Sequence, residues 1–187
     1  MANELSEMSL EELWELFPIF LVEHNDNWGF LYEEMKAKLQ SILSDYPLKI
    51  NHIGSTAIPG IRAKDIVDIL IEIPKEFDIE SVARIIETNG FIRMSTKDRR
   101  ISFNYGYTKN GFADKVYHIH LRYAGDNDEL YFRDYLLEHP NVAKDYESLK
   151  LRLSKQFEHN RDTYTNAKTA FIRKWTDVAK VEYFGRY

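Results

Sequence analysis

Residues 52–73 read HIGSTAIPGIRAKDIVDILIEI, and this segment is the best starting point for interpreting the chain. An apolar lead-in predicts a strand that ends just before Gly54 and Ser55. A second apolar run, residues 66–73, predicts another strand with Asp68 inside it. Because burying an unpaired carboxylate costs several kcal/mol, Asp68 requires a partner, a metal ion or an open cleft.

Alternation of side chains divides this second strand into two faces. The wholly apolar face, which we expect in the core, carries Val67, Ile69, Ile71 and Ile73. Asp68 lies on the opposite face with Leu70 and Glu72, on the side of the turn that carries Ser55. Glu72 stands roughly 13 Å from Asp68 at strand rise, too far to share one ion. Gly54 lets a backbone approach a ligand closely, and Ser55 offers a hydroxyl and an N–H group to an anion such as phosphate.

Residues 116–123 alternate in the same way. The apolar face carries Tyr117, Ile119, Leu121 and Tyr123. His118, His120 and Arg122 share the other face. Two histidines at positions i and i+2 of a strand can converge on one metal ion, and either could act as a general base toward an acceptor hydroxyl. Arg122 could clamp a phosphate, and the alternative for all three residues is an ordinary solvated sheet face.

Other polar residues have both a functional and a structural interpretation. Lys64 precedes the Asp68 strand, where it could meet a phosphate as a point charge or be an ordinary loop lysine. Arg133 or Lys168 could lie over the cleft as a phosphate ligand. We favour instead an ion pair between Arg133 and Asp134 that holds the C-terminal helices against the sheet. Asp68 itself could do no more than hydrogen-bond the Gly-Ser turn.

Composition narrows the class of protein. The chain has 187 residues, 44% of them hydrophobic, which is enough for one domain or a small domain with a helical extension. Its net charge of −5 and pI near 5.7 argue against nucleic acid and anionic membranes as partners. The absence of cysteine excludes disulfides, thiolate metal sites and cysteine nucleophiles. With neither a leader pattern nor an apolar run approaching about 18 residues, we expect a cytoplasmic protein without a membrane partner. The oligomeric state stays undefined.

Periodicity and capping signals predict the remaining elements. Ser9 and Glu12 form a capping box for a short first helix, which Pro18 ends. Expected helices then cover about residues 26–46, 78–90, 128–138, 140–158 and 162–178, with N-caps at Asp26, Asp78 and Asp162. Expected strands cover 20–23, 48–53, 66–73, 91–95, 100–107 and 116–123, with a turn at Asn110-Gly111.

Three of these elements have a predicted apolar face. In the second helix it comprises Phe30, Leu31, Met35, Leu39, Ile42 and Leu43. In the strand at 100–107 it comprises Ile101, Phe103, Tyr105 and Tyr107. In the last helix it comprises Tyr164, Ala167, Phe171, Trp175 and Val178. The fold class is therefore α+β (mixed α/β), with a sheet domain over 1–125 and a C-terminal helical region, 126–187, packed on it as one compact unit.

Residues 52–73 resemble the GrpB family, whose signature combines His-Ile-Gly-Ser-Thr, a Pro-Gly, an Ala-Lys and a strand with a central Asp. Further matches are His118–Arg122, Phe132–Leu136 with His139-Pro140, Tyr146–Lys150 and Tyr164–Ile172, so the likeness covers most of the chain. The family is placed in the nucleotidyltransferase superfamily, whose sites pair a Gly-Ser turn with aspartates on the next strand. The resemblance thus implies a nucleotidyltransferase-like mixed β-sheet with flanking helices.

The same resemblance implies an enzyme that transfers a nucleoside monophosphate from an NTP, with Mg²⁺, to the hydroxyl of an unidentified small molecule or protein. The residues it implies are Asp68, His118 and His120 for catalysis, Asp68 and His120 for the metal ion, and Gly54, Ser55, Lys64, Arg122 and Arg133 for the nucleotide. One departure concerns the second carboxylate of the superfamily, about 7 Å beyond the first on the same strand face. Leu70 occupies that position, although two-metal transfer relies on several carboxylates.

Two alternatives to the enzyme stay open. The first is a degenerate relative that binds a nucleotide or another anion without chemistry, which Leu70 supports. The second is a protein-interaction module, supported only by the aromatic-rich helices. A kinase of the P-loop type is excluded because the chain has no Gly-x-x-x-x-Gly-Lys-Ser/Thr loop.

Overall fold

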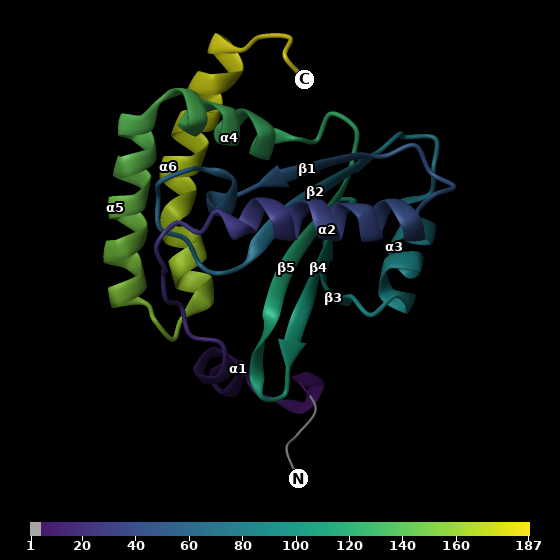
Figure 1. The fold of residues 1–187 in the computed structure, drawn as a ribbon, viewed down its shortest axis with the longest axis horizontal. Coiled ribbons are helices and arrows are strands. Elements are labelled where there is room, and N and C mark those ends of the chain that lie inside the picture. The colour runs from purple at the N-terminus through teal and green to yellow at the C-terminus, as the bar shows by residue number, and fades with distance from the viewer. Residues whose placement is uncertain (1–4) are drawn as a thin grey trace.

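The computed structural model describes residues 5–187 and contains a five-stranded mixed sheet (Figure 1). The strand order is β1-β2-β5-β4-β3, in which β2 and β5 run parallel and every other pair is antiparallel. The strands are β1 (Lys49–Ile53), β2 (Val67–Ile73), β3 (Ile92–Lys97), β4 (Arg100–Thr108) and β5 (Gly111–Tyr123). The predicted mixed α/β class is confirmed.

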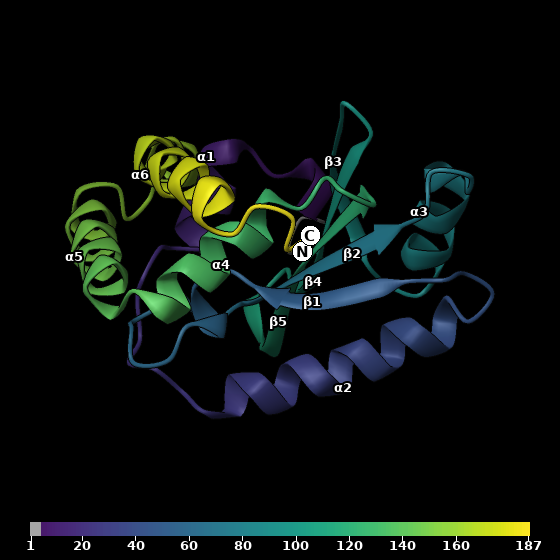
Figure 2. The ribbon, with the colours of Figure 1, turned by 90° about the horizontal axis from the view of Figure 1, so that it is seen from above.

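Helices flank the sheet on both sides (Figure 2). They are α1 (Leu10–Leu16), α2 (Asn27–Ile42), α3 (Ile79–Thr88), α4 (Asp128–Glu138), α5 (Pro140–Gln156) and α6 (Arg161–Glu182), with short 3₁₀ turns η1 (Leu5–Glu7) and η2 (Ser55–Ala57). The last three helices gather beyond β1, at the yellow-green end of the chain. Across residues 5–187, none of the helices carries a stretch long and apolar enough to cross a membrane.

One face of the sheet is closed by α2 and α3. The predicted apolar set of β2 is at most 1% exposed and consists of Val67, Ile69, Ile71 and Ile73. It packs against Trp28 and Leu39 of α2, Val82 of α3, and Ile119 and Leu121 of β5. Each such side chain contributes roughly 1.5–3 kcal/mol when fully buried, so this core holds the sheet and the two helices together.

The other face is covered only in part. Leu70 is fully buried and packs with Ile53 of β1 and Leu130 of α4. Glu72, also buried, accepts hydrogen bonds from the Asn127 amide at 3.0 Å and from the Gly125 N–H at 3.2 Å. The α4 helix therefore closes the half of this face that contains Leu70 and leaves the half near Asp68 open.

The helix caps agree with the predictions at one end of the chain and differ at the other. At α1 the capping box is present, because the Ser9 hydroxyl accepts from the Glu12 N–H and the Glu12 carboxylate accepts from the Ser9 N–H. At α6 the cap is Asn160, whose side chain accepts from the Thr163 N–H at 3.0 Å. Asp162 is not the cap, because the helix already begins at residue 161 and a cap must precede the first helical residue.

The start of α2 also differs in detail from the prediction. Asp26 precedes the helix, but its side chain makes no capping hydrogen bond, and the Asn25 side chain accepts from the Asn27 N–H instead. The phase of the helix buries Trp28 completely and leaves Phe30 75% exposed. Phe30 was therefore wrongly assigned to the apolar face.

A β-bulge changes the face of β4. The register shifts between Tyr105 and Tyr107, and Gly106 between them has φ = 85°. A Cβ atom at residue 106 would lie 2.1 Å from the Lys115 carbonyl oxygen, so glycine is required there. The extra residue turns Tyr107 away from the predicted core face, and its hydroxyl lies 2.8 Å from His118 on the opposite face.

Three smaller predictions need correction. The expected edge strand at 20–23 is a single bridge between Val22 and Ala63. The strand expected at 116–123 begins earlier, at Gly111, because the hairpin after β4 pairs from its first residue. Ala167 and Val178 are exposed, since other residues of α6 face the protein interior.

Candidate active site

The Gly-Ser turn lies directly against Asp68. Gly54 follows the last residue of β1 with φ = 71°, and Ser55 opens η2. A Cβ atom at residue 54 would lie 2.5 Å from Asp68 Oδ2, too close for any real side chain. Strand alternation placed these residues on one side of the sheet, and the structure shows that glycine is needed for the turn to approach the carboxylate.

Two histidines of β5 meet the same carboxylate from the neighbouring parallel strand. In the register, Asp68 is opposite His118 and Leu70 is opposite His120. His118 Nδ1 lies 3.1 Å from Asp68 Oδ1, and His120 Nε2 lies 3.5 Å from the same oxygen. The two histidines and the aspartate, predicted from separate segments, therefore form one cluster.

Arginine partners fix which nitrogen of each imidazole carries the proton. Arg161 Nη2 lies 2.9 Å from His118 Nε2, and Arg122 Nη2 lies 3.4 Å from His120 Nδ1. A guanidinium only donates, so these two imidazole nitrogens must accept. The protons then sit on His118 Nδ1 and His120 Nε2, and both N–H groups point at Asp68.

The charge states follow from burial and from these contacts. Burial alone would raise the pKa of Asp68, but the hydrogen bonds from His118 and His120 outweigh it and hold that pKa well below its ordinary value. Burial lowers the pKa of His118 to about 4, although Asp68 opposes the shift. At neutral pH the cluster therefore contains an ionised Asp68 and a neutral His118.

Four basic side chains surround this cluster in a cavity of about 510 Å³. They are Lys64 from the loop before β2, Lys150 of α5, and Arg161 and Lys168 of α6. Burial, reinforced by neighbouring cations, lowers the pKa of Lys64 and of Lys150 to about 7. Burial also lowers the pKa of Lys168 to about 8. The only carboxylates lining the cavity, within the described part of the chain, belong to Asp68 and Asp162.

The α5 helix holds the loop that carries Lys64. Lys150 Nζ donates to the Arg62 carbonyl, while the Glu147 carboxylate accepts from the Arg62 N–H. One turn earlier, Lys144 Nζ donates to the Gly60 carbonyl. The apolar contacts that accompany these bonds join Ile58 and Ile61 of the loop to Leu136, Ala143 and Tyr146. Main-chain groups of Gly60 and Arg62 are thus bonded by side chains of a helix 84 to 88 residues further along the chain.

The predicted nucleotide-binding residues divide into two groups. Gly54, Ser55 and Lys64 line the cavity together with Asp68, His118 and His120. Arg122 does not line it, because its guanidinium is buried and donates to the carbonyls of Ile101 at 3.1 Å and Leu121 at 2.9 Å. Its contribution to the cavity is indirect, through His120.

Arg133 also lies outside the cavity. It forms an ion pair with Asp134 and donates to the His52 carbonyl at 3.0 Å and to the Tyr187 hydroxyl at 3.0 Å. This is the structural alternative that the sequence favoured, in which the pair holds the C-terminal helices against β1.

Lys150, Arg161 and Tyr107 of the site were given no functional role from the sequence. Arg161 bridges His118 and the Tyr107 hydroxyl, both at 2.9 Å, and its side chain reaches the sheet only because α6 returns to it. Tyr107 reaches His118 through the bulge at Gly106. The glycine inside an alternating strand was the one local signal for this bulge.

The donor set does not fit a protein-held pair of Mg²⁺ ions. Among residues 5–187, no three His, Cys, Asp or Glu side chains are arranged to hold a metal ion. Mg²⁺ takes oxygen ligands, and Asp68 Oδ1 already faces two imidazole N–H groups. For His120 Nε2 to bind a metal, its proton would have to move to Nδ1, which faces the Arg122 guanidinium.

Comparison with known proteins identifies the family of this chain. A family model described as GrpB protein matches residues 18–178. The chain belongs to the GrpB family. It is 33% identical over 160 residues to the glutamate-rich protein GrpB of Alkalihalophilus pseudofirmus, covering 82% of this chain and 91% of that one. It spans about half of some longer relatives, 51% in one case.

Solved structures extend the comparison of this GrpB-family chain to its fold. The crystal structure of the conserved protein GrpB from Enterococcus faecalis matches with a TM-score of 0.76 and 29% identity, covering 88% of this chain and 99% of that one. The Cid1 poly(U) polymerase bound to MgATP matches with a TM-score of 0.51 and 12% identity, covering 79% of this chain and 46% of that one. The second likeness shows a nucleotidyltransferase-like fold and nothing about activity.

Proposed function

We propose that this GrpB-family protein binds a nucleotide through its phosphate groups. The observation that carries the proposal is the gathering of Lys64, Lys150, Arg161 and Lys168 beside the Gly54-Ser55 turn in one cavity. The ion pairs found among the described residues include none of these four cations; those of Asp68 are with the histidines. Lys150 is buried and the other three cations are half-buried; cations removed from water in this way without carboxylate partners are costly, and a polyanion in the cavity would compensate them.

The lowered lysine pKa values support the same proposal. Lys64, Lys150 and Lys168 are held near the point at which they lose their charge, because they are buried close to other cations. A phosphate placed among them would raise these pKa values, since opposite charge favours the protonated form. Binding would therefore take up protons, which calorimetry in buffers of different ionisation enthalpy can measure.

Nucleotidyl transfer to an acceptor hydroxyl of a small molecule or protein is the second candidate. The contact between Gly54 and the ionised Asp68 favours it, with His118 and His120 as the other candidate catalytic residues. It would require Mg²⁺, and the two carboxylates that line the cavity, Asp68 and Asp162, belong to no group of three metal-ligating side chains within residues 5–187, which does not fit a two-metal arrangement. Binding is therefore the better-supported function. The cytoplasmic location expected from the sequence is consistent with a nucleotide ligand and stays a prediction.

The test of binding uses each NTP with the purified protein, with and without Mg²⁺. A ligand at ~100 times its Kd adds about 2.7 kcal/mol to the free energy of unfolding, which thermal denaturation detects. Lys168→Met should weaken binding about tenfold or more, because a hydrogen bond to a charged group is worth roughly 1.5–3 kcal/mol. The matched control is Lys174→Met, an exposed lysine of the same helix that does not line the cavity.

Pyrophosphate release, followed in the same samples with a metabolite extract as acceptor source, separates the two candidates. Stabilisation without pyrophosphate supports binding alone. Pyrophosphate that disappears in Asp68→Asn supports transfer. If no NTP stabilises the protein, or if Lys174→Met weakens binding as much as Lys168→Met, the proposed site is wrong and an interaction module becomes the better explanation.

A further inference from the structure

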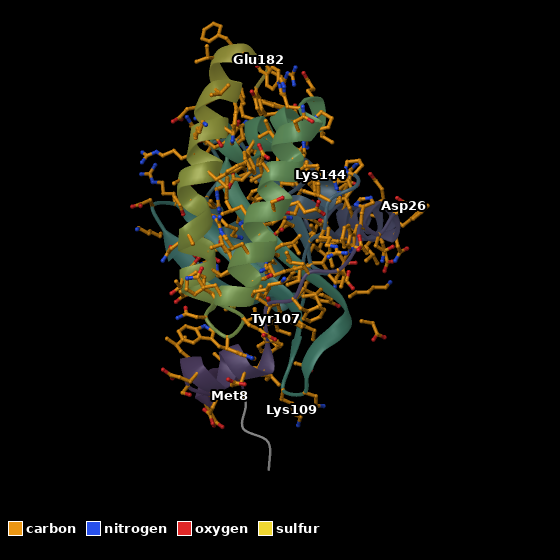
Figure 3. All side chains as sticks on the ribbon, turned by 90° about the vertical axis from the view of Figure 1, so that its left-hand side faces the viewer. Met8, Asp26, Tyr107, Lys109, Lys144 and Glu182 are labelled. Carbon is orange, nitrogen blue, oxygen red and sulfur yellow. The ribbon has the colours of Figure 1, made fainter. Side chains whose placement is uncertain are left out.

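A second cavity, of about 540 Å³, adjoins the cationic one. The two share His118, His120, Arg161 and Asp162 as lining residues. Arg161 stands at the boundary, where it donates to His118 and to the Tyr107 hydroxyl at 2.9 Å. Figure 3 shows Tyr107 at the end of the molecule where α1 lies, below α5 and α6. Each volume falls in the range of small-molecule sites, so two ligands have room side by side.

The walls of this second cavity are apolar and incompletely covered. Trp14 of α1 and Phe17 line it, together with Leu10, Ile92 and Met94, which are 57%, 41% and 55% exposed. No residue of α1 is buried, so the helix stands over the cavity without filling it. Single apolar side chains scattered over a surface are ordinary, but several that surround one cavity indicate a binding site.

The floor of the cavity is polar. Ser102 and Asn104 of β4 line it and stand opposite His120 and His118 in the sheet register. Asn104 is only 5% exposed and lines the cavity, so its side-chain amide is available to a ligand there. An amide both donates and accepts, so a hydroxyl or similar group of a ligand can bond to it.

Charge distinguishes the two cavities. The second one is bordered by Arg93, but that guanidinium is already paired with Glu80 and Glu87, at 2.8 Å each. The free lysines Lys64 and Lys168 line only the first cavity. Arg161 lines both cavities, but only the first adds unpaired lysines to it, so a phosphate is favoured in the first cavity over the second.

We propose that the second cavity binds an uncharged, ring-bearing molecule with a hydroxyl or similar hydrogen-bonding group, as a second ligand beside the phosphate ligand. The ring packs against Trp14, Phe17 and Met94, and the polar group meets Asn104 on the floor. The proposal rests on the proposed function only for the identity of the neighbouring ligand. Binding in the second cavity is testable by itself.

The probes are 2-naphthol for the second cavity and inorganic tripolyphosphate for the first, each titrated by calorimetry. We expect 2-naphthol to bind the unmodified protein and to shift the indole N–H resonance of Trp14, while that of the fully buried Trp28 stays in place. Met94→Glu should weaken 2-naphthol about tenfold or more, because the ring would desolvate an unpaired carboxylate. Val181→Glu is the matched control, since Val181 is an exposed apolar residue of α6, outside both cavities.

The outcomes separate this inference from the proposed function. Saturating tripolyphosphate should leave 2-naphthol bound, and Met94→Glu should leave tripolyphosphate affinity unchanged. The proposal for the second cavity is wrong if either probe displaces the other, if 2-naphthol does not bind detectably, or if it binds Met94→Glu as well as the unmodified protein. If tripolyphosphate fails to bind while 2-naphthol still responds to Met94→Glu, the proposed function is wrong and the second cavity stands.

Discussion

The two faces of the sheet differ in how completely helices cover them, although both are made by alternate residues of the same strands. On one face α2 and α3 bury Ile69 and Ile71 without a gap. On the other, α4 covers Leu70 but stops short of Asp68, which opens to the cationic cavity. The position of the site is therefore set by where a distant helix ends. Leu70, the residue that stands where the family resemblance led us to look for a second carboxylate, lies in the covered half.

The largest expected effect comes from placing a carboxylate in the half of the sheet face that α4 covers. Leu70→Asp should lower the free energy of unfolding by about 5 kcal/mol, because it removes a buried leucine and leaves a carboxylate among Ile53 and Leu130. It should not confer Mg²⁺-dependent activity. Urea denaturation measures the first effect, and Leu70→Met, expected to cost less than about 1.5 kcal/mol, is the control. A stable Leu70→Asp protein that gains Mg²⁺-dependent stability would show that the covered half can serve as a metal site.

Raising the pH should weaken anion binding in the cavity, while the lysines of the cavity make the folded protein more stable. The pKa of Lys64 and of Lys150 falls to about 7 from the ordinary 10.5. Between those values the unfolded chain binds more protons than the folded one, so these lysines make the free energy of unfolding rise with pH. Affinity for tripolyphosphate needs the charged lysines and should fall tenfold or more from about pH 7.5 to pH 9.5.

Calorimetric titrations across that range, beside denaturation at the same pH values, check both trends. The probe loses its own last proton within this window and becomes more negative, which would strengthen binding, so a fall in affinity reports the loss of charge on the lysines. Lys168→Met removes one of the titrating groups and should flatten the profile, while Lys174→Met should preserve it. Affinity that is independent of pH would place the anion elsewhere on the protein.

A smaller effect is expected from Asp68→Asn, which keeps the shape of the side chain and removes its charge. If phosphates bind without a metal ion, tripolyphosphate affinity should rise several-fold, because a nearby negative charge is lost, worth about 1 kcal/mol at ~4 Å in water. Titration in the presence of a chelator measures this change. Weaker binding in Asp68→Asn, seen only when Mg²⁺ is present, would instead make the carboxylate a metal ligand.

The smallest effect tests which part of α2 belongs to the closed face. Phe30→Ala should change the free energy of unfolding by no more than about 0.5 kcal/mol, because Phe30 is largely exposed. Trp28→Ala, at the fully buried position two residues earlier, should cost about 3–5 kcal/mol. Comparable losses in the two variants, measured by urea denaturation, would contradict the phase of α2.

Local patterns were enough to predict most of the fold. Alternation in β2 and β5 identified both faces, since a period of two depends only on neighbouring residues. The capping box at Ser9 and the turn before Gly111 are likewise local signals. Errors arose where one residue changes the phase of an element, as at Gly106 in β4 and at the start of α2 around Trp28.

The candidate site was predicted only as far as its sheet. Asp68, His118 and His120 lie on adjacent strands and Gly54 directly follows β1 beside them, so register and alternation bring them together. Arg161 could not be placed, because its position depends on how α6 packs against residues far away in the sequence. Arg122 starts from the predicted face, but its guanidinium donates to the Ile101 carbonyl of β4 instead of entering the cavity. Alternation assigns a side chain to a face and does not reveal which partner it reaches.

The hydrogen bonds from α5 to the loop before β2 limit how this protein can be truncated or recombined with a relative. Lys144, Glu147 and Lys150 together hold the main chain at Gly60 and Arg62. A fragment that ends at residue 125 would keep every strand of the sheet and lose the groups that shape this loop. The C-terminal helices are thus no exchangeable module: grafting them from a relative would transplant part of the pocket as well, and only a donor with matching side chains at these three positions would restore it.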